Sequence, residues 1–249
     1  MVDWAAVLAS TRPMRLAGTL CRLVESQEQV ATNQLVSSLV RQSWLEEMLE
    51  ATKPPRRPGT ERLHYLLATP FRYPPLKHGS RFGRRNEPSL FYGAQETRTV
   101  LAEAAYYRFV FWYGMAEPPP GKLDTQHTLF AAKYQTETGV RLQVAPFAEH
   151  ENVLCDPVEH RQTQVLGTCM REAGIEAFEY RSARDHEGGI NVGLFTPAAF
   201  AHPKPVSQEA WLCELTGEHV RFRPAHGGKL HGFPIESFQL DGVLPWPSL

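Results

Sequence analysis

The sequence has no long apolar run, few cysteines and no excess of charge of either sign. No segment approaches the roughly 20 apolar residues that a membrane-spanning helix needs. Residues 1–10 contain Asp3 and lack the basic and then apolar pattern of a secretory signal. The 26 basic residues nearly balance the 27 acidic ones, which disfavours a general binder of nucleic acid or anionic membranes. These absences predict a reduced, soluble, cytoplasmic protein with no direct nucleic-acid or membrane partner.

Several motifs of common enzyme classes are also absent. The four cysteines, Cys21, Cys155, Cys169 and Cys213, are too far apart for a Cys-x-x-Cys metal or redox motif. The ten histidines form neither His-Glu-x-x-His nor a zinc-ligand spacing, and there is no Gly-x-Ser-x-Gly elbow of a serine hydrolase. We therefore expect no metal site and no serine-hydrolase chemistry.

Residues 27–52 carry apolar side chains at helical spacing, and a proline-rich stretch at 53–59 ends the pattern. We therefore expect an N-terminal helical extension over residues 1–55. The main domain then covers residues 56–249 and ends in a β-structured tail. An apolar stripe of this kind must be buried against something. It either packs on the core of the main domain, which we favour, or serves to dock a partner or cap the domain.

Beyond residue 59 the sequence changes to short alternating stretches typical of strands, with helical stretches between them. Some strands are separated by helices and others pair as hairpins, so the class is mixed α and β. Helices are expected at 97–113 and 155–173, and strands at 64–68, 89–92, 140–147, 175–182, 190–195, 211–215 and 219–222.

Glu103 is the one charged residue within the apolar stretch 100–107 of the expected 97–113 helix. It shares a helix face with Val100 and Tyr107. An unpaired buried charge is costly, so this carboxylate needs a partner. Glu103 is therefore either held in a functional site or tied to an arginine for packing alone.

The stretch 78–86 combines two glycines, a serine and three arginines. Glycines let a backbone approach a ligand, and arginine forks match phosphate oxygens, so a dinucleotide pyrophosphate suits this loop. The alternative is a solvated basic loop. The stretch is neither a P-loop nor Gly-x-Gly-x-x-Gly, which disfavours kinases, P-loop ATPases and standard dinucleotide-binding dehydrogenases. Arg81, Tyr92 and Glu103 follow at equal intervals, so a loop, a strand and a helix start can bring them to one cleft.

Ser182 ends the strand expected at 175–182. A hydroxyl at a strand end is well placed to face a ligand, although a serine in an ordinary turn is the commoner case. Together with the residues above, its surroundings complete a set of motifs that resembles the RES domain over residues 65–200. The motifs are Phe71-Arg72-Tyr73, Gly79-Ser80-Arg81-Phe82, Leu90-Phe91-Tyr92-Gly93-Ala94, Thr99-Val100-Leu101-Ala102-Glu103, and Tyr180-Arg181-Ser182-Ala183-Arg184 with Gly188-Gly189-Ile190-Asn191.

The resemblance implies both a fold and an activity. The family is named for an arginine, a glutamate and a serine, which would be Arg81, Glu103 and Ser182. The implied fold is α+β, similar to ADP-ribosyltransferases of the diphtheria-toxin type, with a split β-sheet around an NAD cleft. The implied activity is that of a bacterial toxin that consumes NAD as a substrate, without a prosthetic group. It would pass ADP-ribose to inorganic phosphate, as an NAD phosphorylase, or to water. The implied partner is an antitoxin with an Xre-like DNA-binding region, whose other end plugs the cleft.

These residues allow a mechanism for breaking the bond between nicotinamide and ribose. Glu103 is expected to stabilise an oxocarbenium-like transition state. Arg81 is expected to hold the pyrophosphate or an acceptor phosphate, with Arg72 as a second candidate for either role. The expected supporting residues are Tyr92, which stacks on a nicotinamide or adenine ring and donates from its hydroxyl, Ser182, which orients the ribose, and Asn191. The alternatives are a protein ADP-ribosyltransferase that modifies a metabolic enzyme and a non-catalytic protein-interaction module.

Overall fold

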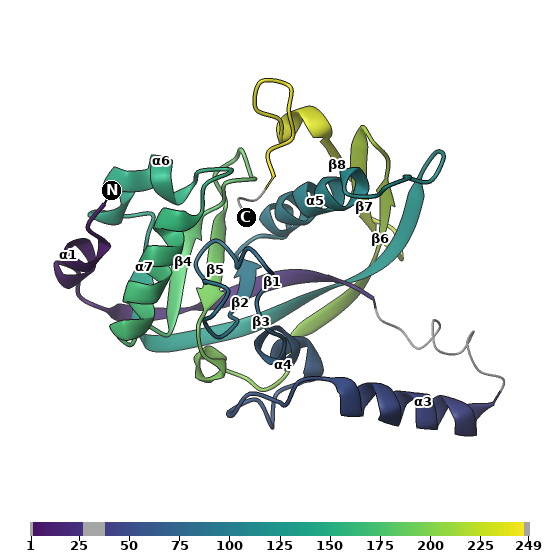
Figure 1. Cartoon of the computed structure of the whole chain (residues 1–249), viewed down its shortest axis with the longest axis horizontal. Helices are drawn as coiled ribbons and strands as arrows, with labels where there is room; N and C mark the ends of the chain where they lie inside the picture. Colours follow the sequence, from purple (N-terminus) through teal and green to yellow (C-terminus); the bar gives the residue numbers. More distant parts are fainter. Residues whose placement is uncertain (1, 27–37, 247–249) are drawn as a thin grey trace.

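The computed structural model describes residues 2–26 and 38–246 (Figure 1). Its mixture of helices and strands confirms the α+β class. The helices are α1 (Trp4–Ala9), α3 (Leu39–Thr52), α4 (Tyr65–Arg72), α5 (Thr97–Tyr113), α6 (Glu151–Leu154) and α7 (Arg161–Glu172). The strands are β1 (Met14–Glu25), β2 (Phe91–Ala94), β3 (Leu123–Arg141), β4 (Ala177–Arg181), β5 (Ile190–Leu194), β6 (Ser207–Leu215), β7 (His219–Pro224) and β8 (His231–Pro234).

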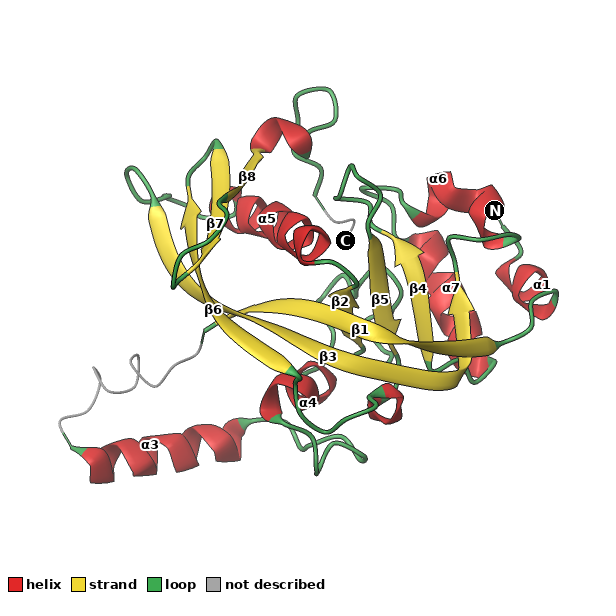
Figure 2. Ribbon diagram, turned by 180° about the vertical axis from the view of Figure 1, so that it is seen from behind, coloured by secondary structure: helices red, strands yellow, loops and turns green. Residues whose placement is uncertain are grey.

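Within the described residues, eight strands form one mixed sheet in the order β1-β2-β5-β4-β3-β6-β7-β8. β3 runs parallel to β4, and the other neighbours are antiparallel. β1 also pairs with β3, from Met14 opposite Gly139 to Glu25 opposite His127, so β1, β2, β5, β4 and β3 close into a ring. The long strands β1 and β3 run side by side through the body (Figure 2), and β3 connects this ring to β6, β7 and β8.

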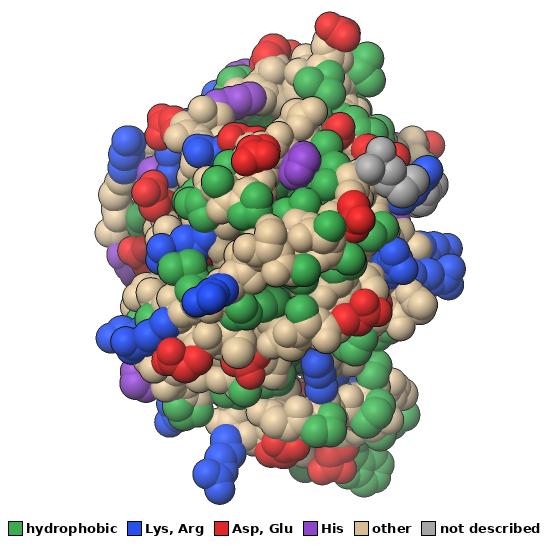
Figure 3. Space-filling view, turned by 90° about the vertical axis from the view of Figure 1, so that its left-hand side faces the viewer, with side chains coloured by type: hydrophobic (Ala, Val, Ile, Leu, Met, Phe, Trp, Pro, Cys, Tyr) green, Lys and Arg blue, Asp and Glu red, His purple; other side chains and the backbone are tan. Residues whose placement is uncertain are grey.

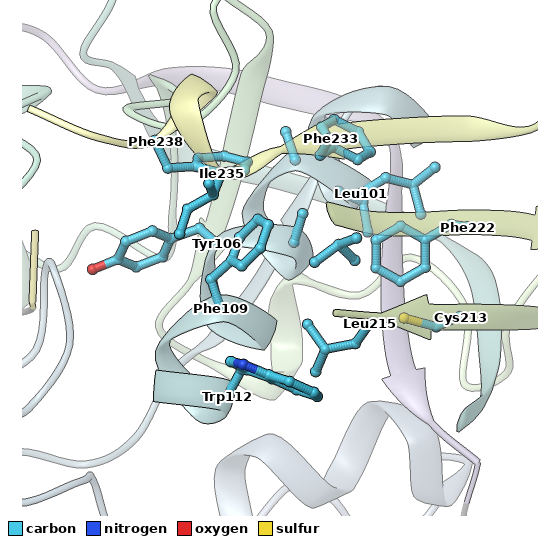
Figure 4. Close-up of a cluster of buried hydrophobic side chains, with 14 of the residues drawn as sticks. Leu101, Tyr106, Phe109, Trp112, Cys213, Leu215, Phe222, Phe233, Ile235 and Phe238 are labelled. Atoms are coloured by element: carbon cyan, nitrogen blue, oxygen red, sulfur yellow. The ribbon is translucent and has the colours of Figure 1, made fainter. Parts of the chain in front are cut away.

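Helix α5 lies beside the β6–β8 end of the sheet and buries one face against it (Figure 1). The sequence forms a helix here because residues 97–113 contain neither glycine nor proline, and the helix ends at Gly114. Each large apolar side chain buried in this way stabilises the fold by roughly 1.5–3 kcal/mol. Figure 4 shows the cluster, with Leu101, Tyr106, Phe109, Trp112, Cys213, Leu215, Phe222, Phe233, Ile235 and Phe238 labelled. This packing fixes the direction in which the other faces of α5 point.

Two further buried clusters fix the ring of strands. One cluster joins α1 and α7 to β4 through side chains that include Trp4, Met170 and Phe178. The other joins α4 to the ring, where the Phe71 ring stacks near Phe91 with centroids 6.3 Å apart. The helices therefore hold the ring from both sides.

Several expected elements are confirmed, and others are corrected. The helix at 97–113 is α5, the strands at 175–182 and 190–195 are β4 and β5, and the expected hairpin is β6 with β7. The strand expected at 89–92 lies slightly later, as β2.

Three stretches differ more strongly from the expectation. Residues 64–68 are not a strand, since they begin α4, whose first turn is capped by the His64 side chain accepting a hydrogen bond from Leu66 N. The strand expected at 140–147 is only the end of β3, which stops at Arg141. The helix expected at 155–173 starts later, at Arg161, because Pro157 disfavours a helix interior.

The N-terminal segment also differs from the expected helical extension. Residues 14–25 form β1, a strand of the central sheet. Of the helix expected over residues 27–52, positions 27–37 lie outside the described residues, and α3 forms the rest.

The prediction that the apolar stripe of this helix packs on the core is wrong for α3. Val40, Trp44 and Met48 are each 68% exposed, and α3 extends away from the body in Figures 1 and 2. The polar side of α3 attaches this helix to the body instead, because Glu50 pairs with Arg72 of α4 at 2.7 Å.

Charges of both signs are present on the surface. On the face in Figure 3, acidic and basic side chains are interspersed, and the formal net charge of the chain is -1. Over residues 2–26 and 38–246, no helix is long and apolar enough to cross a membrane. The same residues contain no group of three or more His, Cys, Asp and Glu side chains that could hold a metal ion.

Candidate active site

A cavity of about 370 Å³ lies between α5, β1, β2 and the loop at residues 76–81. This volume is within the usual range of small-molecule sites, roughly 300–1,000 Å³. The face of α5 that lines it carries Val100, Glu103, Ala104 and Tyr107. These positions are three or four residues apart and so share one side of the helix.

Glu103 is held in this cavity by two short hydrogen bonds to the same carboxylate oxygen. Oε1 accepts from Ser182 Oγ at 2.6 Å and from Asn191 Nδ2 at 2.6 Å. Both donors are buried, and charge-assisted hydrogen bonds of this length are among the stronger ones. Among the described residues no hydrogen bond goes to Oε2, so this oxygen is left for a ligand.

The Ser182 hydroxyl is fully engaged within the protein. It donates to Glu103 and accepts from the backbone N–H groups of Arg184 and Asp185, each at 3.1 Å. A hydroxyl has one donor and two acceptor positions, so all three are filled. Ser182 therefore fixes the Glu103 carboxylate and keeps no hydrogen-bonding position for a ligand.

The turn at residues 182–185, which follows β4, also holds the start of α5. The buried carboxylate of Asp185 accepts a hydrogen bond from Thr99 Oγ1 at 2.8 Å. Thr99 and Glu103 are one helical turn apart on the same side of α5. A Cβ at Gly189 would lie only 1.9 Å from Thr99 Oγ1, so only glycine permits this close approach. The turn after β4 thus sets the position of Glu103 along the helix.

Arg81 lies at the tip of a tight turn in which Ser80 N donates to Gly83 O at 2.8 Å. Gly79 makes the turn possible: its φ is +73°, and an added Cβ would lie 2.4 Å from Gly83 O. Gln164 of α7 donates to the carbonyls of His78 and Ser80. This part of the loop is therefore anchored, contrary to a freely solvated loop.

Tyr92 of β2 braces the same loop through its hydroxyl. The hydroxyl accepts from Phe82 N at 3.0 Å and lies 2.9 Å from Ser80 Oγ. It thus bonds the two residues that flank Arg81. Burial raises the pKa of Tyr92 to about 12, so its hydroxyl stays protonated at neutral pH. The expected donation from Tyr92 to a substrate stays a prediction, and the ring lines the cavity.

Three arginines give the cavity a positive character. Arg81 Nη1 donates to the carbonyls of Leu154 and Asp156, at 3.1 and 2.8 Å. Arg184 lies over the Tyr106 ring, 3.5 Å from its centroid, and donates to Pro157 O. The third, Arg22, comes from β1.

The positive charge in the cavity is not neutralised by carboxylates. Arg22, Arg81 and Arg184 form no ion pair within the described part of the chain, and Glu103 is the one carboxylate among the residues that line the cavity. Burial, and then the charges of Arg81 and Arg184, lower the pKa of the lining residue His160 to about 3. His160 is therefore neutral at pH 7, and the cavity combines three arginines with one fixed carboxylate, a charge distribution that suits an anion.

Arg72 does not reach this cavity. Its Nε donates to Pro54 O at 2.6 Å and its Nη1 pairs with Glu50 of α3. Arg72 thus anchors α3 to the body, and the expected role in holding a ligand is not supported. Arg81, Tyr92, Glu103 and Asn191 line the cavity, and Ser182 contacts it through Glu103.

Sequence reasoning missed Arg22 and Arg184 as site residues. Arg184 stands in the Tyr-Arg-Ser-Ala-Arg motif, and its place two residues after Ser182 was the available signal. Arg22 lies in β1, where no motif marks it, so nothing in the sequence identified it.

The protein has a mixed α+β fold, and its cavity combines three arginines with one fixed carboxylate. The model of the RES domain matches residues 54–216, and the chain belongs to the RES domain family. No curated protein matches the chain. Among solved structures, it is similar to a chain of the crystal structure of the M. tuberculosis MbcT–MbcA toxin–antitoxin complex. The TM-score is 0.49 and the sequence identity 10%, and the match covers 86% of this chain and 92% of that chain.

Proposed function

We propose that this protein cleaves the nicotinamide–ribose bond of NAD and passes ADP-ribose to inorganic phosphate or to water. The observation that carries the proposal is the Glu103 carboxylate, fixed by Ser182 and Asn191 inside an arginine-lined cavity. In this interpretation the fold is ADP-ribosyltransferase-like, and the cavity is the NAD cleft. NAD is a substrate, and no prosthetic group takes part.

The chemistry requires a fixed negative charge more than a proton donor. Nicotinamide in NAD is already cationic and leaves with the bonding electrons, so no general acid is needed. Positive charge then develops on the ribose, and a preorganised carboxylate beside it stabilises that charge. Glu103 Oε2 is available for this role because the protein's own donors bond Oε1.

The arginines supply the binding energy and the orientation. Arg81 and Arg184 are both held by carbonyls of residues 154–157, so their forks are fixed before a ligand arrives. Fixed guanidinium groups suit the two phosphates of a dinucleotide. An oxygen of phosphate or water then forms the new bond to the ribose carbon that nicotinamide has left.

The biological role that fits this chemistry is that of a toxin in a toxin–antitoxin pair. NAD is shared by central metabolism, so unregulated cleavage harms the cell that carries it. Membership of the RES family supports this role. A protein partner that inserts a carboxylate beside Arg81 and Arg184 would block the cavity, and an antitoxin with an Xre-like DNA-binding region is the expected kind of partner.

Incubation of the purified protein with NAD, with and without inorganic phosphate, tests the proposal. Products are identified by mass. Phosphate-dependent nicotinamide release with a phosphorylated ADP-ribose product supports the phosphorylase, and free ADP-ribose supports the hydrolase. ADP-ribose attached to protein favours the protein ADP-ribosyltransferase instead. Absence of nicotinamide release under all conditions contradicts the proposal and leaves the non-catalytic interaction module.

A further inference from the structure

The cavity is completed by a strand outside the part of the chain that the family model matches. The model matches residues 54–216, whereas Cys21, Arg22 and Leu23 of β1 line the cavity. β1 reaches this position because it pairs with β3 along its length and with β2 at Cys21 opposite Ala94. The most polar group that β1 contributes to the cavity is the guanidinium of Arg22.

Arg22 differs from comparable arginines elsewhere in the described chain. Arg72, Arg108 and Arg171 have side chains only 12–15% exposed, and each forms an ion pair with a glutamate. Arg22 has no such partner in the described residues. Its one hydrogen bond there runs from Nη1 to Tyr92 O at 2.6 Å, and its buried Nε has no hydrogen-bond partner, which leaves the Nε–Nη2 edge of the guanidinium for a ligand. Burial lowers the pKa of Arg22 to about 10, so it is still charged at neutral pH.

Arg22 is also separate from the other two cavity arginines. Arg81 donates to the carbonyls of Leu154 and Asp156, and Arg184 donates to that of Pro157. The carbonyls of residues 154–157 hold Arg81 and Arg184, whereas Arg22 is held on β2. The cavity therefore offers positive charge at two positions.

We propose that Arg22 forms a second anion-binding position in this cavity. This position binds a phosphate group and is separate from the position formed by Arg81 and Arg184. The identity of the ligand rests on the proposed function, because NAD cleavage to phosphate brings both a dinucleotide pyrophosphate and an acceptor phosphate into one cavity. Both sources present the same chemistry, tetrahedral phosphate oxygens that a guanidinium binds in a bidentate manner.

A purely structural role for Arg22 makes a different prediction. Its bond to Tyr92 O and its position over the Phe91 ring, 5.0 Å from the centroid, hold β1 beside β2. If that is its whole role, Arg22→Gln lowers the melting temperature and leaves anion affinity of the folded protein unchanged.

Isothermal titration of the full chain with ADP-ribose, and separately with inorganic phosphate, distinguishes these roles. Arg22→Gln should raise the Kd of at least one probe about tenfold, the effect of losing one charge-assisted hydrogen bond. Arg15→Gln is the matched control, because Arg15 lies on the same strand, is exposed and pairs with Glu137; its Kd values should be unchanged. The probe that loses affinity identifies which phosphate Arg22 takes.

This titration tests the role of Arg22 separately from the proposed cleavage of NAD. Neither probe is cleaved, so the Kd values can be measured even if NAD proves not to be a substrate. Wild-type Kd values for both probes in Arg22→Gln, or no binding of either probe to wild-type protein, overturn the proposal. Should Arg22→Gln fail to fold, Arg22→Lys decides, because lysine keeps the charge but loses the bidentate fork. Weaker binding then supports the proposal, and unchanged binding overturns it.

Discussion

Removing the Tyr92 hydroxyl tests whether this residue positions Arg81. Tyr92→Phe keeps the ring that lines the cavity and deletes only the oxygen that bonds Phe82 N and Ser80 Oγ. The residues on both sides of Arg81 then lose their attachment to β2, whereas the contacts of Arg81 with Leu154 and Asp156 remain. The expected result is a loosened loop in a protein that still folds.

The expected decrease in the free energy of unfolding follows from the two hydrogen bonds that Tyr92→Phe removes. Phe82 is fully buried, and an unsatisfied buried N–H costs roughly 1–3 kcal/mol. Loss of the bond to Ser80 adds about 1 kcal/mol. Tyr92→Phe should therefore lower the free energy of unfolding by roughly 2–4 kcal/mol, which for a chain of this size lowers the melting temperature by about 5–15 °C.

The functional effect is read from NAD cleavage well below the melting temperature. The KM for NAD should rise about three- to tenfold while kcat changes less than about twofold, because in the proposed mechanism Arg81 binds the substrate and Glu103 stabilises the transition state. Tyr113→Phe is the control, since it removes an exposed hydroxyl of α5 that bonds Gly217 O. A Tyr92→Phe protein with wild-type stability and KM, or one that loses kcat instead, refutes the positioning role.

Three further changes test other parts of the account. Arg72→Ala should leave the KM for NAD unchanged, because its contacts are with Pro54 and Glu50; a large rise in KM would restore it as a ligand residue. Thr99→Val should lower kcat about five- to twentyfold by freeing α5 from Asp185, and an unchanged kcat would count against the role of this turn. His160 has its pKa lowered to about 3, first by burial and then by Arg81 and Arg184, whereas in the unfolded chain it titrates near 6.5. Between these values the unfolded state binds the extra proton, so the free energy of unfolding decreases as the pH is lowered, by up to about 1.4 kcal/mol per pH unit. His160→Gln should weaken this pH dependence in urea unfolding at pH 7 and pH 5, and an equal slope in both proteins would contradict the interpretation.

The parts that the sequence predicted well are those with strong local signals. The 97–113 helix has no glycine or proline and ends at Gly114, so its bounds and the position of Glu103 on it followed from the residues alone. The hairpin of β6 and β7 was equally local. The prediction that Arg81, Tyr92 and Glu103 meet at one cleft depended on spacing and resemblance, and all three line the cavity.

The parts that were missed depend on contacts between distant segments. β1 buries only Leu16 and Leu20 strongly, so it lacks the clear alternation of a half-buried strand, and its partner β3 follows about a hundred residues later. Residues 64–68 alternate weakly enough to fit either a strand or a helix, and tertiary packing decided for the helix. Arg72 belongs to a matching motif, yet it pairs with Glu50 of α3 and is not among the residues that line the cavity.

The most direct test of the central claim is the rate of nicotinamide release by Glu103→Gln at saturating NAD. The amide is nearly isosteric and still accepts from Ser182 and Asn191 through its oxygen, but it cannot stabilise the developing ribosyl cation by charge. We expect a fall of about 10² to 10³ in kcat, with a melting temperature close to wild type and an unchanged Kd for ADP-ribose. A folded Glu103→Gln protein that releases nicotinamide at a rate within about twofold of wild type would contradict the central claim.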